Sequence, residues 1–103
     1  MKIYIAGPIT GIDNYKENFN TVADKLTNLG FRVMNPAILP EGFEWEEYMA
    51  ICIPMLSCCH AVLMLEGWED SRGAREEYDK ALELGLTVIT QQELKELEQG
   101  AVA

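Results

Sequence analysis

Two adjacent glutamates, Glu76 and Glu77, are the residues whose spacing most directly suggests chemistry. They lie in a helix predicted for residues 73–84, whose apolar arc, at about 100° per residue, consists of Ala74, Tyr78, Ala81, Leu82, Leu84 and Gly85. Glu77 falls inside this arc, whereas Glu76 points to solvent, where Lys80 can pair with it one turn later. A partly desolvated carboxylate near a helix N-terminus is placed as a nucleophile or a base would be. The alternative is a structural glutamate that reaches water at the edge of the core.

The turn before this helix carries further candidates. It follows the strand-like apolar run of residues 61–65 and contains Trp68, Asp70, Ser71 and Gly73. Ligand sites in open α/β sheets lie there, outside the carboxyl ends of the strands. Ser71 can cap the helix or, with the amides that follow it, hold a phosphate. Trp68 can stack on a nucleobase, and Trp45 can close the opposite side of such a site; the alternative for each is packing in the core or at a subunit interface.

The N-terminal segment supplies a second part of the same predicted site. Residues 2–6 form an apolar run typical of a buried strand, and the loop that follows it consists of Gly7, Pro8, Ile9, Thr10 and Gly11. Its amides and the Thr10 hydroxyl are groups that can bind an anion. The alternative is that its glycines simply form a tight turn.

The remaining elements follow from periodicity and from Gly, Pro and Asn signals. Asp13 or Asn14 caps a first helix, which ends at Gly30, and residues 37–43 form a loop long enough to fold over a site. Pro54 should kink or restart the helix that contains it. The other predicted elements are strands at 31–34, 60–65 and 86–90, helices at 45–56 and 91–98, and a frayed tail at 99–103.

Strands that alternate with helices predict an α/β fold with a parallel sheet, right-handed crossovers and both faces covered. We expect a single three-layer domain over residues 1–98, flavodoxin- or Rossmann-like, with strand order 2-1-3-4. In this order the first and third strands are neighbours. The loop at residues 7–11 and the turn at residues 68–73 therefore face one crevice.

Composition narrows the class of protein. The 103 residues allow one domain, and 49% hydrophobic residues allow one core. A net charge of −9, with eight scattered Lys and Arg, argues against binding to nucleic-acid polymers or to anionic membranes. We see no charged-then-apolar leader and no apolar run of membrane-spanning length, so we expect a cytoplasmic protein.

Three cysteines and one histidine gather in one stretch: Cys52, Cys58, Cys59 and His60. Reduced thiols fit this pattern better than a disulfide framework does. A zinc site would need four ligands crowded onto one helix end and one strand start, so we expect neither a metal nor another cofactor. Cys59 and His60 should point to opposite faces of a strand, which disfavours a catalytic pair.

Three segments, residues 3–11, 67–77 and 81–88, resemble the nucleoside 2-deoxyribosyltransferase superfamily, and more narrowly its small, often phage-encoded domain of unknown function, DUF4406. In this family a Ser-x-Gly-x-x-x-Glu pattern ends in the catalytic glutamate, which alanine and glycine follow at four-residue steps. The matching residues here are Ser71, Gly73, Glu77, Ala81 and Gly85.

The resemblance implies cleavage or transfer at the N-glycosidic bond of a (deoxy)nucleoside or nucleoside 5′-monophosphate. Glu77 would be the nucleophile, and water or a second base would take the glycosyl intermediate. Tyr4 matches the family's first-strand tyrosine, which implies a hydrogen bond to the nucleophile or to the sugar. Relatives complete their pockets across a dimer interface, so a homo-oligomer formed by the helix at residues 45–56 is also implied.

The sequence departs from the family pattern at two positions. Cys52 stands where an aspartate is usual, and His60 stands where an acid is frequent, which leaves protonation of the departing base unassigned. Asp70 is the nearest candidate, although an acid at a helix start more often caps. Two alternatives to an enzyme therefore stay open: a non-catalytic protein that sequesters a nucleotide or an NAD-derived ligand, and a purely structural or interaction protein.

Overall fold

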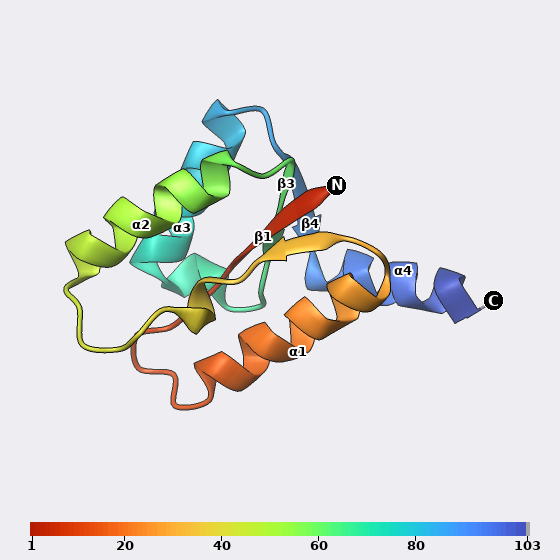
Figure 1. Ribbon diagram of the computed structural model, residues 1–103, viewed down its shortest axis with the longest axis horizontal. Coiled ribbons are helices and arrows are strands. Elements are labelled where there is room, and N and C mark those ends of the chain that lie inside the picture. The colour runs from red at the N-terminus through yellow and green to blue at the C-terminus, as the bar shows by residue number, and fades with distance from the viewer. Residues whose placement is uncertain (103) are drawn as a thin grey trace.

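In the computed structural model, which describes residues 1–102, a four-stranded parallel sheet carries two helices on each face (Figure 1). The strand order is β2-β1-β3-β4, as predicted from the alternation of strands and helices. The elements are β1 (Lys2–Ala6), α1 (Tyr15–Asn28), β2 (Arg32–Met34), the 3-10 turn η1 (Pro36–Ile38), α2 (Trp45–Ser57), β3 (Ala61–Met64), the 3-10 turn η2 (Trp68–Asp70), α3 (Arg72–Glu83), β4 (Thr87–Thr90) and α4 (Gln91–Val102).

The two inner strands, β1 and β3, are the most buried part of the sheet. All four β3 residues are buried, as are all β1 residues except Lys2, because both faces of these strands are covered. They pair directly, with Tyr4 opposite Val62 and Ala6 opposite Met64. The topological switch point therefore lies between the carboxyl ends of β1 and β3, where the sequence predicts the site.

The alternation of side chains along β1 separates two cores. Ile3 and Ile5 point to the face covered by α1 and α4, the α1/α4 face, where they meet Phe19 and Leu94. Tyr4 points to the face covered by α2 and α3, the α2/α3 face. Its buried partners there are Ala6, Cys52, Leu56, Cys59, Val62, Met64, Ala74 and Ala81. Figure 1 shows these helix pairs on opposite sides of the strands.

Several helix details differ from the sequence-based expectations. α2 is continuous to Ser57 and is not restarted at Pro54, whose position inside the helix is exposed. α4 continues beyond Glu98 to Val102, while Ala103 of the predicted frayed tail lies outside the described residues. Leu82 and Leu84, expected on the apolar arc of α3, are exposed because the helix ends at Glu83 and the chain turns away through Gly85, where φ is +73°.

Candidate functional site

The side chain of Glu77 lies inside the α2/α3 face and meets Tyr4 there. Glu77 is 6% exposed and is the one charged residue that is buried among residues 1–100. The hydroxyl of Tyr4, which is fully buried, donates a hydrogen bond to Oε2 of Glu77. Helical spacing explains the placement, since Ala74, Glu77 and Ala81 form the buried stripe of α3. The structure thus brings together the two residues for which the sequence predicts catalytic roles.

Burial controls the ionisation of this pair. It raises the pKa of the Glu77 carboxyl to about 7, and the hydrogen bond from Tyr4 acts in the opposite direction by favouring the charged form. The pKa of Tyr4 is raised well above its ordinary value, first by burial and then by the neighbouring Glu77 charge. Tyr4 therefore remains a hydrogen-bond donor at neutral pH, while Glu77 is near its titration midpoint.

Cys52 is the third titratable group in this core. It lies on α2 and is buried in the same core cluster as Tyr4. Burial raises the pKa of the thiol, so it stays protonated at neutral pH. The sequence did not indicate this burial beside Tyr4, because no local pattern shows which strand residue lies beneath a given helix residue.

The other members of the cysteine-rich stretch lie elsewhere. His60 is exposed and directly precedes β3, so it lies at the amino ends of the strands, away from the predicted site at their carboxyl ends. Its Nδ1 accepts a hydrogen bond from the Lys2 amide at 3.0 Å. Cys59 is buried while Cys58 is exposed, and all three cysteines are free thiols. Both Cys59 and His60 precede β3, which begins at Ala61, so the expected strand alternation does not apply to them; the Cys59 thiol donates to the Met55 carbonyl at 3.5 Å.

The two loops of the predicted crevice run side by side. The Leu65 amide donates to the Ala6 carbonyl at 2.8 Å, which joins the ends of β3 and β1. Gly7 packs so closely on Leu65 that an added Cβ would lie 2.7 Å from the Leu65 Cβ. Gly67, with φ of +88°, faces the ring of Pro8. Further along the same loop, Ile9, Thr10 and Gly11 are exposed at this edge of the sheet.

Ser71 caps α3. Its hydroxyl oxygen accepts a hydrogen bond from the Ala74 amide at 3.3 Å. Asp70 precedes it in η2 with an exposed side chain, so the cap is formed by Ser71 and not by the acid. Gly73 follows in the first turn, where an added Cβ would lie 3.4 Å from the indole nitrogen of Trp45. These groups surround the start of the helix that carries Glu77.

Both tryptophans already have a partner within the chain. Trp68 stacks on Tyr78 with ring centroids 4.6 Å apart, which is the packing alternative to base stacking for that face of the ring. The Arg72 guanidinium lies 3.9 Å from the centre of the Trp45 ring. Arg72 also pairs with Glu76 at 3.8 Å, whereas Lys80 pairs with Glu83 at 3.4 Å, so the expected Glu76–Lys80 pair is wrong. Arg72 is a cation beside the site that sequence reasoning missed.

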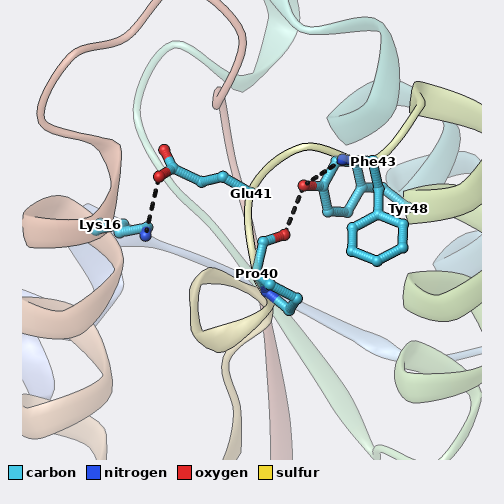
Figure 2. Close-up of polar contacts among 5 residues, drawn as sticks. All are labelled: Lys16, Pro40, Glu41, Phe43 and Tyr48. Atoms are coloured by element: carbon cyan, nitrogen blue, oxygen red, sulfur yellow. Dashed lines mark hydrogen bonds and ion pairs between the residues drawn. The ribbon is translucent and has the colours of Figure 1, made fainter.

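The loop at residues 37–43, which the sequence predicts to be long enough to fold over a site, is tied to the neighbouring elements by several contacts. Its Leu39 packs against the core cluster that contains Tyr4 and Cys52. The Tyr48 hydroxyl donates to the Pro40 carbonyl at 2.6 Å and accepts from the Phe43 amide at 3.3 Å. On the other side, Lys16 of α1 pairs with Glu41 at 3.7 Å. Figure 2 shows the loop held between α1 and α2 by these contacts.

The surface hollows lie away from the Tyr4–Glu77 pair. One is a groove between α2 and α3 lined by Ile53, Glu76, Asp79, Lys80 and Glu83. Another lies against α4 and is lined by Ile89, Glu93, Glu96, Leu97 and Gly100. Neither includes Tyr4 or Glu77. The loop at residues 37–43, called the cover here, packs on the same core through Leu39.

Residues 1–90 match the family described as "Domain of unknown function (DUF4406)". The chain belongs to this family. Its fold is that of 2-deoxyribosyltransferases: a 2-desoxiribosyltransferase from Leishmania mexicana superposes with a TM-score of 0.68 at 23% identity, over 86% of this chain and 62% of that one. A 2-deoxyribosyltransferase from Bacillus psychrosaccharolyticus gives 0.69 at 18% identity, over 87% and 71%.

The DUF4406 chain thus spans less than two thirds of the Leishmania protein. No curated protein matches it. Within residues 1–102, no helix has the length and apolar character needed to cross a membrane.

Proposed function

We propose that this DUF4406 protein cleaves or transfers the N-glycosidic bond of a (deoxy)nucleoside or nucleoside 5′-monophosphate, with Glu77 as the nucleophile. The observation that carries the proposal is the buried Glu77 carboxylate, hydrogen-bonded by the buried Tyr4 at the switch point of the sheet. The fold shared with 2-deoxyribosyltransferases supports this class of reaction.

Within this proposal, the two carboxylate oxygens of Glu77 have separate roles. Oε2 accepts the Tyr4 hydrogen bond, which leaves Oε1 to attack the anomeric carbon. The C–N bond breaks, its electron pair leaves with the base, and a glycosyl ester forms on Glu77. Water or a second base then displaces the carboxylate. Because the pKa of Glu77 is about 7, the reactive anion is present in roughly half of the molecules at neutral pH.

The surrounding groups have roles in substrate binding within this proposal. The loop of Gly7, Pro8, Ile9, Thr10 and Gly11 and the turn with Trp68, Ser71 and Gly73 hold the nucleoside, and their amides and hydroxyls bind a 5′-phosphate when one is present. Asp70 is the nearest candidate by sequence to pass a proton from solvent to the departing base, since its side chain is exposed. Ser71, and not Asp70, forms the helix cap, so the Asp70 carboxyl is not committed to capping. The cytoplasm and a homo-oligomer are the setting that we propose.

A second function has an observation in its favour. Cys52 takes the place of an aspartate in the family pattern, and Leu39 closes the cover over the core that holds Tyr4. Both features suit a protein that binds a nucleotide or an NAD-derived ligand tightly without turning it over. Such a protein would bind its ligand with the same stoichiometry before and after long incubation and would release no free base.

The test is incubation of the protein with a panel of nucleosides and 5′-monophosphates, with and without an acceptor base, followed by chromatography for free base. The matched variants are Glu77→Gln and Glu76→Gln, on the buried and exposed sides of one helix turn. We expect at least a roughly thousandfold loss in Glu77→Gln, as for removal of a nucleophile, and near wild-type rates in Glu76→Gln. Full activity of Glu77→Gln would exclude the mechanism, and binding without base release would support the sequestering function.

A further inference from the structure

We propose that the groove beside α4 is a docking site for a short, basic, amphipathic helix of a partner protein. This α4 groove is the hollow lined by Ile89 of β4 and by Glu93, Glu96, Leu97 and Gly100 of α4. It belongs to the α1/α4 face, whereas Tyr4 and Glu77 meet on the α2/α3 face. The inference therefore does not rest on the proposed function.

The α4 groove lies at the edge of the sheet and lacks a third wall. All its lining residues come from β4 and α4, and β4 pairs with β3 alone among the strands of residues 1–102. Leu94, which is 2% exposed, and the pair of Glu98 with Lys25 at 3.6 Å hold α4 to the rest of the α1/α4 face. Leu97, on the groove side, has no such cover and is 45% exposed. Figure 1 shows α4 extending past the strands towards the C-terminus.

The charges of the groove indicate the kind of partner. Glu93 and Glu96 stand beside Leu97 on one stripe of α4, because residues three and four apart share a helix face. Neither carboxylate forms an ion pair with another described residue. In the hollow between α2 and α3, by contrast, Lys80 already pairs with Glu83 at 3.4 Å. An apolar floor with free carboxylates beside it complements a segment whose apolar side chains are flanked by Lys or Arg.

The edge of β4 favours a helix over an added strand. β4 has 4 residues, and its Thr90 amide already donates to Oε1 of Glu93 at 3.4 Å, so few backbone groups remain for strand addition. From Glu93 to Gly100 the groove runs about 10 Å along α4, at about 1.5 Å per residue. That length matches about two turns of a helix laid into the groove.

A second copy of this chain is a poorer occupant than a basic segment. In a symmetric pair the same groove would serve both copies, so the Glu93 and Glu96 side chains of each would face those of the other. Like charges placed opposite one another disfavour association, and the chain already carries a net charge of −9. The few lining residues also fall short of the roughly 20–30 that each partner contributes to a standard interface.

The experiment uses a designed helical peptide as the probe. It is capped at both ends, has an alanine background, carries two leucines one turn apart with lysines on either side, and is about 14 residues long, near the minimum for an isolated helix. Its control has glutamates in place of the lysines. Each peptide is titrated into the ¹⁵N-labelled protein. We expect saturable one-to-one binding of the lysine peptide, with amide shift changes confined to β4 and α4, and no binding of the glutamate peptide.

Matched variants separate the groove from the general acidity of the surface. Leu97→Asn and Glu96→Gln change exposed groove residues, while Leu82→Asn and Glu83→Gln change the same residue types at the exposed end of α3. We expect roughly tenfold weaker binding in Leu97→Asn and roughly threefold weaker binding in Glu96→Gln, because the first loses the apolar anchor and the second one rim charge. Both α3 variants should bind as wild type does.

Three results would overturn the proposal. Equal weakening in the α3 variants, or shift changes spread over the whole surface, would mean non-specific attraction to an acidic chain. Unaltered affinity in Leu97→Asn, or no binding to the wild type, would mean that the groove is not the site. A wild-type dimer in analytical ultracentrifugation that Leu97→Asn dissociates would assign the groove to a second copy of the chain.

Discussion

The two faces of the sheet bury different kinds of side chain. On the α1/α4 face, β1 contributes Ile3 and Ile5 to a core cluster whose members are all apolar. On the α2/α3 face, the intervening residue Tyr4 donates a hydrogen bond to the carboxylate of Glu77, in a cluster that also contains Cys52. The alternation of one strand thus separates a core that contributes stability from a core that contains ionisable groups, one residue apart.

The polar core stays folded because its groups satisfy one another. Burying a carboxylate costs free energy unless hydrogen bonds compensate, and the Tyr4 hydroxyl supplies such a bond to Glu77. Compensation is incomplete, as the raised pKa of Glu77 shows. This combination of residual destabilisation and a fixed geometry is typical of sites where chemistry takes place. The variants below are chosen to break or to sharpen the contrast between the faces.

The largest effect is expected on the apolar side. Phe19 is fully buried against the α1/α4 face, and Phe19→Ala should lower the free energy of unfolding by about 3–5 kcal/mol through lost burial and a cavity. The Glu77 titration should not change in the protein that remains folded. Urea denaturation measures the first effect, with Ile38→Ala as the control because Ile38 is 76% exposed. A shift in the Glu77 pKa would show that the two cores are coupled through the sheet.

The second prediction concerns Glu77, whose replacement should raise stability at neutral pH, whereas Phe19→Ala lowers it. The fold raises its pKa from 4.5 to about 7, so between these values the folded state holds a proton that the unfolded state has lost. Stability therefore falls as pH rises through this window, by about 3 kcal/mol in total, and is level above it.

Glu77→Gln should lack this slope, so relative to wild type it gains stability as the pH rises. Glu76→Gln, at the exposed neighbour, should retain the slope. Chemical denaturation of all three proteins from pH 4 to pH 8 measures the difference. Parallel curves for wild type and Glu77→Gln would mean that Glu77 titrates normally and that its burial has little energetic cost.

These contrasts also show what could be predicted from sequence. Helical and strand periodicity are local, and they sufficed for the strand order and for the choice of Glu77 over Glu76. The same reasoning placed Leu82 and Leu84 on the apolar arc, but both are exposed at the end of α3, where the helix stops at Glu83 and the chain turns away. Periodicity gives the direction of a side chain, and the extent of the neighbouring layer decides whether it is buried.

Contacts between distant segments could not be predicted. The hydrogen bonds of Tyr48 to the loop, the packing of Leu39 and the burial of Cys52 in the cluster of Tyr4 all depend on how α2 lies on the sheet. The position of Arg72 over Trp45 depends on the same packing. Tyr4 was selected by resemblance to a family and not by its own pattern, since an aromatic residue in a buried strand is ordinary.

The third prediction concerns the hydrogen bond from Tyr4 of β1 to Glu77 of α3. Tyr4→Phe should lower turnover roughly ten- to a hundredfold, the loss expected for one positioned hydrogen bond at a reacting centre. The pKa of Glu77 should rise further, because the group that favours its charged form is gone. Tyr15→Phe is the matched control, since Tyr15 packs edge-on against Phe19 on the other face. Unaltered turnover and titration would make Tyr4 a core residue without a role in the site.

The fourth prediction concerns the start of α3. As an N-cap, Ser71 should contribute roughly 0.5–2 kcal/mol to stability, which Ser71→Ala removes. If the hydroxyl also binds phosphate, the same variant should lose part of a preference for a nucleoside 5′-monophosphate over its nucleoside. Calorimetric titration of both ligands against both proteins measures this. Equal affinities in the wild type would count against a phosphate site.

The smallest effect is expected for the loop at residues 37–43, which packs on the α2/α3 core through Leu39. Tyr48→Phe deletes the hydroxyl that bridges Pro40 and Phe43 but keeps the aromatic ring against Phe43, so stability should fall by no more than about 1 kcal/mol. Loss of the bridge should let the loop open more readily over Leu39. Ligand association and dissociation should then both become a few-fold faster, with little change in affinity.

Stopped-flow binding measures these rates. The control is Glu41→Gln, which weakens the exposed pair with Lys16 and should have a smaller effect in the same direction, because exposed ion pairs contribute little. Unchanged rates in Tyr48→Phe would mean that ligands reach Glu77 without passing this loop, and the search for their route would then turn to the edge formed by Pro8 and Gly67.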